Sequence, residues 1–253
     1  MMISYTLILA FAATVSSQWI DYPDTGLATM SHYGGLSNTT AASCGCEPLT
    51  ANYATAALSQ MAYGSSSAFG PACGKCFNLT LLNTIASDPP WNLTDAQKKS
   101  VIVKITDLCP LSKDGWCDGT QNKLNDGGHQ MNFDLAYPSN AIPTDFYPTN
   151  ASYYGYDDFG VWNISYSVVS CVSDWAGATD VSAQGIVTGL DSSGGCCPTD
   201  PTVEGNTTCA SYSDEHNLSP DSLPSGALPI MTTPWALSVG VGAVVLSRWL
   251  VGF

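Results

Sequence analysis

Hydrophobic and polar residues alternate in short runs between Leu27 and Cys171, and most runs end at a cluster of Gly, Pro, Asn or Asp residues. The clearest run covers residues 101–107, where β-branched residues occupy one face of a strand while Lys104 and Thr106 occupy the other. Short strands separated by turn residues predict an all-β domain with little helix.

Two further segments, residues 76–82 and 159–171, have a similar pattern, and we expect both to be strands. Residues 50–63 are rich in Ala, Leu and Met and end at Gly64, which makes them the strongest helix prediction in the chain. Two Asp-Gly pairs between residues 114 and 127 predict turns between the central strands.

Both ends of the chain are apolar and differ from this body. Residues 3–13 precede the small residues 15–17, which predicts a secretory signal peptide cleaved after Ser17. At the other end, residues 225–227 are small, and a short spacer leads to the apolar residues 235–253, as in a GPI-attachment signal. A single transmembrane helix is the alternative, although no Lys or Arg follows the apolar run.

The charge balance narrows the classes of partner. The chain has 21 Asp and Glu residues against 7 Lys and Arg residues, which gives a formal net charge of -14. Such a chain repels a phosphate backbone, so nucleic acid is excluded as a partner. Hydrophobic residues make up 45% of the sequence, which is enough for a substantial core.

Ten cysteines in an exported chain predict disulfides. Metal ligands or a thiol nucleophile are disfavoured, because only three His residues accompany the cysteines, and we expect no cofactor and no metal. The cysteines fall into a group of seven up to residue 171 and a group of three from residue 196 onward. Seven is odd, so if all ten pair within the chain, at least one disulfide must join the two groups. The first group is Cys44, Cys46, Cys73, Cys76, Cys109, Cys117 and Cys171, and the second is Cys196, Cys197 and Cys209.

Asn-x-Ser/Thr sequons agree with export and predict a glycoprotein. They are Asn38, Asn78, Asn92, Asn150, Asn163, Asn206 and Asn217. The features described so far divide the chain into five parts. In order, we expect a signal peptide (1–17), a main domain (18–175), a disulfide-tied extension (176–209), a solvated Ser/Pro-rich stalk (210–225) and an anchor signal (226–253).

Two aspartates stand out because they occupy strand positions. Asp107 falls on the apolar face of its strand, and alternation places Asn132 and Asp134 on one face of the next candidate strand with Phe133 on the other. An Asp on the apolar side of a strand favours a raised pKa, and a neutral carboxylic acid is what protonation of a glycosidic oxygen requires. The alternative is that these carboxylates cap turns or accept backbone hydrogen bonds.

Several motifs occur in an order that resembles a known family. They are Gly70–Phe77, Val103–Pro110, Asp114–Cys117 and Asn132–Ala136, with Ala28–Tyr33 before them and Val169–Trp175 after them. Together they resemble the six-stranded double-psi β-barrel of family-45 glycoside hydrolases and of the catalytic-like domain of expansins, over residues 25–175. The resemblance is strongest to the small fungal branch of the hydrolases, which implies a fungal secreted protein.

The resemblance also implies roles for individual residues. Asp134 matches the general acid of the hydrolases, although Asn132 stands where their motif has His. Asp107 matches an aspartate that hydrolases and expansins share and that shapes the site. The base aspartate of the larger hydrolase branches is absent, because two glycines follow Tyr33. Asp114 lies nearest the position of the base in the small fungal branch, and a simple turn role before a glycine is its alternative.

Neutral sugars are bound by aromatic faces and hydroxyl hydrogen bonds. The candidate sugar platforms are Tyr33, Trp116 and Trp175, with Thr29 and Asn132 as polar neighbours. Core packing is the alternative for each aromatic residue.

The sequence therefore favours a secreted endo-β-1,4-glucanase-like enzyme that hydrolyses a neutral cell-wall β-glucan with inversion. We expect a monomer that is held at the cell surface or in the cell wall by a lipid anchor. An expansin- or loosenin-like protein that loosens polysaccharide without cleaving it is the main alternative, and a barwin-like defence protein or inhibitor is a third.

Overall fold

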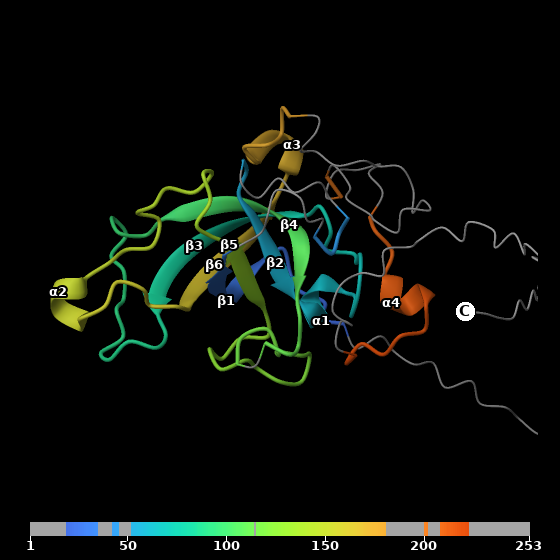
Figure 1. Cartoon of the computed structure of the whole chain (residues 1–253), viewed down its shortest axis with the longest axis horizontal. Helices are drawn as coiled ribbons and strands as arrows, with labels where there is room; N and C mark the ends of the chain where they lie inside the picture. The colour runs from blue at the N-terminus through green and yellow to red at the C-terminus, as the bar shows by residue number, and fades with distance from the viewer. Residues whose placement is uncertain are drawn as a thin grey trace, which may run out of the picture.

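Six strands close into a single barrel in the computed structural model, which describes residues 19–34, 42–45, 52–113, 115–180, 200–201 and 208–222 (Figure 1). The strands follow one another around the barrel in the order β1-β5-β2-β4-β3-β6. The pairs β1–β5 and β2–β4 are parallel, and the other four neighbouring pairs are antiparallel. The strands are β1 (Thr25–Tyr33), β2 (Thr55–Ser59), β3 (Cys76–Thr84), β4 (Ser100–Cys109), β5 (Asn132–Ala136) and β6 (Trp162–Val169). This architecture confirms the predicted all-β, six-stranded double-psi barrel.

The helices of the described residues are single turns. They are α1 (Gln60–Tyr63), α2 (Ala151–Tyr154), α3 (Cys171–Asp174) and α4 (Tyr212–Glu215). The helix predicted over residues 50–63 is therefore wrong for most of its described length, because residues 55–59 form strand β2. Every residue of β2 is buried between β4 and β5, so this strand has no polar face whose alternation would have marked it.

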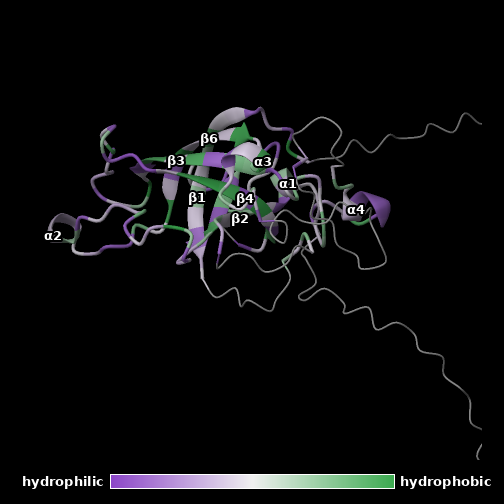
Figure 2. Ribbon diagram, turned by 90° about the horizontal axis from the view of Figure 1, so that it is seen from above, coloured by the Kyte–Doolittle hydropathy of each residue, from purple (hydrophilic) through white to green (hydrophobic). Residues whose placement is uncertain are grey.

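Aromatic and branched side chains fill the barrel. Phe77 and Phe133 meet with ring centroids 5.1 Å apart, and Tyr166 lies against both rings. Figure 2 shows hydrophobic residues along the barrel strands and a strongly hydrophilic α4 at the edge of the molecule. The edge-to-face contacts add to the stabilisation that burial itself provides.

The outer face of β4 is covered as well. Lys104 has only 1% of its surface exposed, and its Nζ lies 5.3 Å from the centre of the Trp175 ring. Burial lowers the pKa of Lys104 to about 8, although the negative charge of Asp200 acts in the opposite direction. The alternation that places Lys104 opposite the apolar face of β4 is therefore correct, but both faces of this strand are buried.

Three disulfides have both partners among the described residues. They are Cys44–Cys73, Cys76–Cys171 and Cys109–Cys117. Cys209 is also disulfide-bonded, whereas Cys46, Cys196 and Cys197 lie outside the described residues. Asp200 is buried and accepts hydrogen bonds from the Ser170 hydroxyl at 2.7 Å and from the Val172 amide at 3.2 Å. Around Asp200, the extension is therefore packed against the main body.

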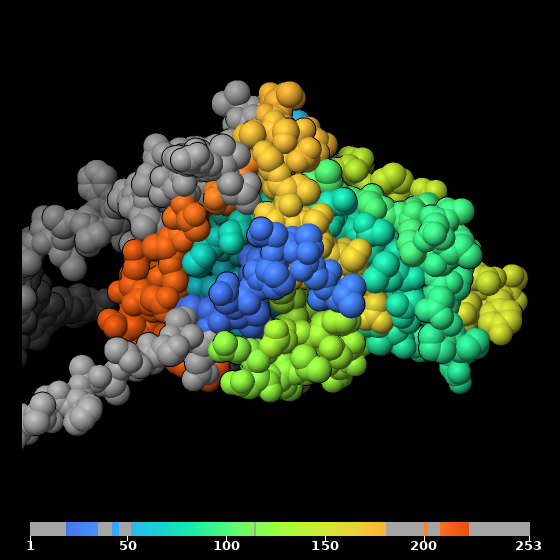
Figure 3. Space-filling model, turned by 180° about the vertical axis from the view of Figure 1, so that it is seen from behind, coloured from blue at the N-terminus to red at the C-terminus, as the bar shows by residue number. Residues whose placement is uncertain are grey.

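Residues 208–222, which we name the C-terminal strap, differ from the predicted solvated stalk. Ser213 is fully buried, and its hydroxyl lies 2.6 Å from that of Ser66. The Tyr212 ring packs edge-to-face on Phe69 at 5.3 Å. In Figure 3 this segment (orange) lies beside the beginning of the described chain (blue), and the Trp19 indole N–H donates to the Asp214 carboxylate at 3.1 Å. The composition of this segment could not predict these contacts, because a few residues make them with partners far away in the sequence.

The remaining parts of the predicted division lie at or beyond the edges of the described chain. The signal peptide at 1–17 and the anchor signal at 226–253 fall outside the described residues, as do the sequons Asn38 and Asn206. Within the described part of the chain, no helix is long and apolar enough to cross a membrane.

Candidate functional site

A cavity of about 440 Å³ opens beside the last residues of β1 and β4 and the middle of β2 and β5. The lining comes from four strands and from the loop after β4. The lining residues are Ser31, His32, Tyr33, Gly34, Ala57, Asp107, Leu108, Cys109, Pro110, Lys113, Trp116, Cys117 and Asp134. The structure thus brings together four of the predicted site residues: Tyr33, Asp107, Trp116 and Asp134.

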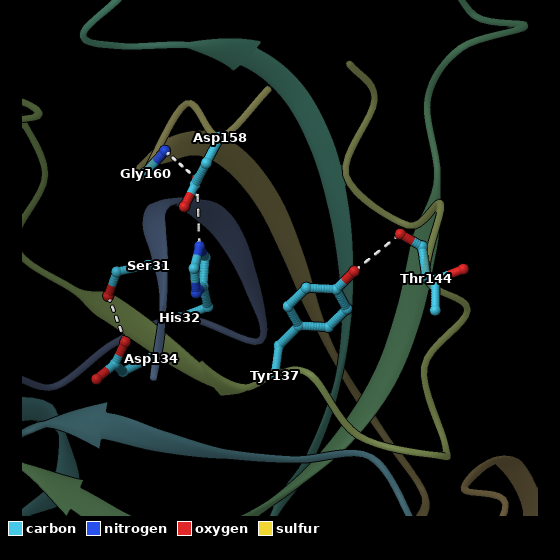
Figure 4. Close-up of polar contacts among 7 residues, drawn as sticks. All are labelled: Ser31, His32, Asp134, Tyr137, Thr144, Asp158 and Gly160. Carbon is cyan, nitrogen blue, oxygen red and sulfur yellow. Dashed lines mark hydrogen bonds and ion pairs between the residues drawn. The ribbon is translucent and has the colours of Figure 1, made fainter. Parts of the chain in front are cut away.

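Asp134 is fixed by its neighbour on β1. Ser31 lies opposite Asp134 in the parallel β1–β5 register, and its hydroxyl donates a 2.6 Å hydrogen bond to Oδ1 of Asp134 (Figure 4). Burial raises the pKa of the Asp134 carboxyl, and this effect outweighs the Ser31 hydrogen bond and the charges of His32 and Lys113, which lower it. Asp134 is therefore a partly buried carboxyl whose pKa is raised, as the sequence predicted.

A chain of side-chain hydrogen bonds continues behind Ser31. The Asn132 amide nitrogen donates to the Ser31 hydroxyl at 2.9 Å, and the Asn132 amide oxygen accepts from the Thr29 hydroxyl at 2.7 Å. The Asn125 amide nitrogen donates in turn to the Thr29 hydroxyl at 2.8 Å. Each of these side chains donates to the next one, so the series of hydrogen bonds ends with the Ser31 hydroxyl donating to Oδ1 of Asp134. When Asp134 is protonated, its proton is therefore carried by the other oxygen, Oδ2.

These bonds change the roles predicted for Thr29 and Asn132. Both side chains are fully buried and neither lines the cavity, so they do not contact a bound sugar in this structure. They orient the Ser31–Asp134 pair instead. Gly127 packs against Thr29 so closely that any side chain at this position would collide with it. The segment that carries Asn125 can therefore approach β1 only because residue 127 is glycine.

Asp107 has a different environment from Asp134. Its Oδ1 accepts three hydrogen bonds, from the Ser43 amide at 3.1 Å, the Ser43 hydroxyl at 2.7 Å and the Leu108 amide at 2.9 Å. Asp107 thus holds the segment around Ser43 against the end of β4. The sequence left open that Asp107 accepts backbone hydrogen bonds, and the structure shows this role. It lines the cavity while shaping its wall.

Tyr33 lies beside both carboxylates. Its pKa is raised by burial and further by the negative charges of Asp107 and Asp134. Its hydroxyl is buried and has no hydrogen-bond partner within the described part of the chain. Tyr33 therefore contributes a neutral phenol to the cavity wall, with its ring partly exposed and its hydroxyl shielded from solvent.

The two predicted tryptophan platforms differ in position. Trp116 is half-buried and lines the cavity. Trp175 is only 3% exposed, and its indole N–H donates to the backbone oxygen of Ala54 at 2.8 Å. Trp175 packs with Cys76 and Cys171 away from the cavity, so its assignment as a sugar platform is wrong. Its side chain faces inward because α3 folds back over β4.

Asp114, the predicted base, lies outside the described residues, between Lys113 and Gly115. Both neighbours are described, and Lys113 lines the cavity. Within the described ranges, no three His, Cys, Asp or Glu side chains are grouped closely enough to hold a metal ion.

Sequence reasoning missed Ser31, His32 and Lys113. Ser31 lies between Thr29 and Tyr33 on the same face of β1, so strand periodicity applied to these two predicted residues would have indicated it. His32 points the other way, toward Asp158, with 3.3 Å between Nε2 and Oδ1 (Figure 4). No local pattern marks this pair, because Asp158 lies 126 residues further along the chain.

Comparison with known families adds one match that covers more than half of the chain. The model of the EXPB1-like domain 1 family matches residues 28–177, a range that includes β1 to β6 apart from the first residues of β1. Every described residue of the candidate site falls within it.

Two solved structures have a related fold at low similarity. One is the GH45 endoglucanase EG27II in a substituted form in complex with cellobiose, with 18% identity, a TM-score of 0.41, and coverage of 64% of this chain and 91% of that one. The other is the beta-1,4-D-endoglucanase Cel45A from the blue mussel Mytilus edulis, with 22% identity, a TM-score of 0.42, and coverage of 64% and 88%.

Proposed function

Because the chain belongs to the EXPB1-like domain 1 family, we propose that it acts on a neutral cell-wall β-glucan, as a glycoside hydrolase of the endo-β-1,4-glucanase type. The observation that carries this proposal is the Asp134 carboxyl. Burial raises its pKa, a 2.6 Å hydrogen bond from Ser31 fixes one oxygen, and the side chain lines a cavity of about 440 Å³. These are the requirements for a general acid that protonates a glycosidic oxygen.

The reaction is an inverting hydrolysis. Asp134 transfers its proton to the glycosidic oxygen as the bond from that oxygen to the anomeric carbon breaks, and water attacks the same carbon from the opposite face. A base accepts the proton that the water loses. We assign this role to Asp114, because it directly follows Lys113 in the sequence, and Lys113 lines the cavity. Asp107 is less suited, since its Oδ1 is occupied by three hydrogen bonds.

Substrate binding rests on Tyr33 and Trp116. The exposed part of the Trp116 ring offers a flat face to a pyranose ring, and the partly exposed Tyr33 ring adds a second aromatic surface. The deeper residues Thr29 and Asn132 keep Ser31 aligned with Asp134. This division of roles suits an uncharged polymer, which has no charge for the protein to pair.

A non-hydrolytic function in binding and loosening polysaccharide is the second candidate. One observation favours it: Tyr33 is followed in the sequence by Gly34, which lines the cavity, and then by Gly35, so neither of these two residues supplies a base carboxylate. A protein with the acid and the aromatic residues but without a competent base would bind glucan and not cleave it.

Release of reducing ends distinguishes the two functions. Wild type, Asp134→Asn and the control Asp95→Asn are incubated with cellulose, mixed-linkage β-glucan and glucomannan. Asp95 is an exposed aspartate paired with Lys98 and lies outside the cavity. If the protein is a hydrolase, wild type and Asp95→Asn release reducing ends at similar rates. The rate for Asp134→Asn is then at least about a hundredfold lower, in line with the loss of a general acid. Binding of glucan by all three proteins without any release supports the loosening function instead.

The cellular location remains part of the proposal. Disulfides within the barrel fit an oxidising, extracellular setting. We place the mature protein at the cell surface, attached through a lipid that replaces residues 226–253. Phospholipase C specific for inositol lipids should release the protein from membranes. An acyl group on the inositol makes some anchors resistant, so a resistant sample is first deacylated. A protein that then still stays on the membrane contradicts the assignment.

A further inference from the structure

The side chain of Gln60 joins two segments that are far apart in the sequence. Gln60 is the first residue of α1 and is fully buried. Its Nε2 group donates to the carbonyl oxygens of Pro220, at 2.8 Å, and Ser222, at 2.7 Å. Its Oε1 accepts from the backbone N–H of Leu111 at 3.1 Å. One amide therefore binds the C-terminal strap and the loop after β4 at the same time.

These three bonds leave only one orientation for the Gln60 amide. Exchanging its nitrogen and oxygen would place Oε1 against two carbonyl oxygens and the NH₂ group against an N–H donor. The group is buried, so losing the strap would leave both amide hydrogens without acceptors and would favour a different rotamer. The bond to Leu111 consequently depends on the presence of the strap.

The Leu111 side of this connection forms part of the candidate site. Pro110 and Lys113 line the cavity, and the Lys113 amide donates to the Pro110 carbonyl at 2.9 Å in a tight turn around Leu111. The second half of the loop is held through the Trp116 carbonyl, which accepts from Asn125 at 3.0 Å, and the Cys117 amide donates back to the Lys113 carbonyl at 3.2 Å. Gln60 holds the half that carries Lys113, whose positive charge acts on Asp134.

The strap side of the connection is fixed by α4. The Ser213 hydroxyl is buried and accepts from the Ser66 amide at 2.7 Å, and the Tyr212 amide donates to the Phe69 carbonyl at 3.2 Å. The partners of Tyr212 and Ser213 directly follow α1 in the chain. Besides the contact of Asp214 with Trp19, the strap is therefore docked on residues 65–69 through α4 and on Gln60 through its last described residues.

We propose that Gln60 is a positioning residue that makes the cavity wall at residues 110–113 depend on the docked C-terminal strap. The inference rests on the proposed function only because this wall belongs to the site of Asp134. Undocking of the strap releases Gln60, then Leu111, and moves Lys113 relative to Asp134. The segment that connects the barrel to the end of the chain is thus a component of the site.

Hydrogen exchange at the Leu111 amide tests this connection without an activity assay. The variants are Gln60→Leu, which removes the amide, and Ser213→Leu, which introduces a side chain too large for a fully buried position. We expect Leu111 exchange to rise about tenfold or more in both, as for the loss of one ordinary hydrogen bond. The matched control is Gln97→Leu, because the Gln97 amide also accepts from a backbone N–H, that of Thr94, but lies outside the site.

Ser213→Leu gives the decisive comparison, because residue 213 does not touch the loop. Fast exchange of the strap amides with Leu111 still protected would show that the strap and the loop are independent, and would overturn the proposal. If Ser213→Leu leaves the strap protected, the double variant Ser213→Leu/Asp214→Ala also removes the Trp19 contact, and Leu111 protection that survives release of the strap overturns the proposal.

The hydrolysis assay adds a second readout. In Ser213→Leu we expect kcat to fall while KM changes less, and the alkaline limb of the pH profile to move upward, because the charge of Lys113 no longer lowers the pKa of Asp134. If wild type releases no reducing ends, the proposed hydrolysis fails while the exchange result still decides whether Gln60 links the strap to the loop.

Discussion

Ser31 Oγ and Asp134 Oδ1 lie 2.6 Å apart across the parallel pair of strands β1 and β5. The bond comes from the strand register, because Ser31 and Asp134 are Cα partners in the ladder. It fixes which oxygen of the carboxyl stays open to a substrate. The environment of Asp134 therefore depends on residues 103 positions earlier in the chain.

Ser31→Ala tests this relationship. The Ser31 hydroxyl favours the ionised carboxylate, so its removal raises the pKa of Asp134 further. The protonated acid then persists to higher pH, and we expect the alkaline limb of the kcat/KM profile to move up by about one pH unit. The free rotation of Asp134 should also lower kcat about tenfold. The control Ser100→Ala, which loses a surface hydroxyl bonded to Thr80, should leave the profile unchanged.

Lys104→Met tests the buried cation on the outer face of β4. Burial lowers the pKa of Lys104 to about 8, whereas in the unfolded chain it lies near the ordinary value of 10.5. Between these values the unfolded state binds more protons than the folded state, so the contribution of Lys104 makes the protein more stable as pH rises from 8 to 10. We expect Lys104→Met to remove this slope from the free energy of unfolding, as measured by urea titration at several pH values. An unchanged slope in the variant contradicts the assignment.

Trp175→Ala and Trp116→Ala separate a core residue from a binding residue. Trp175 is 3% exposed and hydrogen-bonded to Ala54, so its truncation should lower the free energy of unfolding by about 3–5 kcal/mol. Trp116 lines the cavity, and its truncation should weaken glucan binding about tenfold with a much smaller loss of stability. Denaturant titration and affinity electrophoresis in gels containing β-glucan measure the two effects. Equal loss of binding in both variants goes against this division of roles.

The disulfides should differ in what they contribute. Cys76–Cys171 joins residues 95 positions apart, whereas Cys109–Cys117 closes a separation of 8. From chain entropy, replacing the first pair by alanine should lower the free energy of unfolding by about 4.7 kcal/mol and replacing the second by about 2.5 kcal/mol. The order should reverse for activity, because Cys109 and Cys117 both line the cavity. Denaturant titration and the reducing-end assay on the two double variants check both orders.

Some features of the protein could be predicted from local sequence. The alternation in β4 and β5 identified two strands and placed Asp134 on the face opposite Phe133, and the ordered motifs indicated the barrel. Side-chain period and turn residues act over a few positions, so a single sequence carries this information directly. The raised pKa of Asp134 agrees with the sequence prediction, and its cause is burial on the face of β5 opposite Phe133.

Other features were decided by which segments pack together. Residues 55–59 form a strand because β4 and β5 lie on either side of them, and Trp175 is buried because α3 folds over Lys104. Thr29 and Asn132 support Asp134 from behind through hydrogen bonds between strands, and Gln60 connects the strap to the loop after β4. Burial and hydrogen bonding depend on partners more than a hundred residues away in several of these cases. The sequence by itself therefore determined several of the barrel strands and the raised pKa of Asp134, whereas only the tertiary structure decided what surrounds Asp134 and what holds its cavity in place.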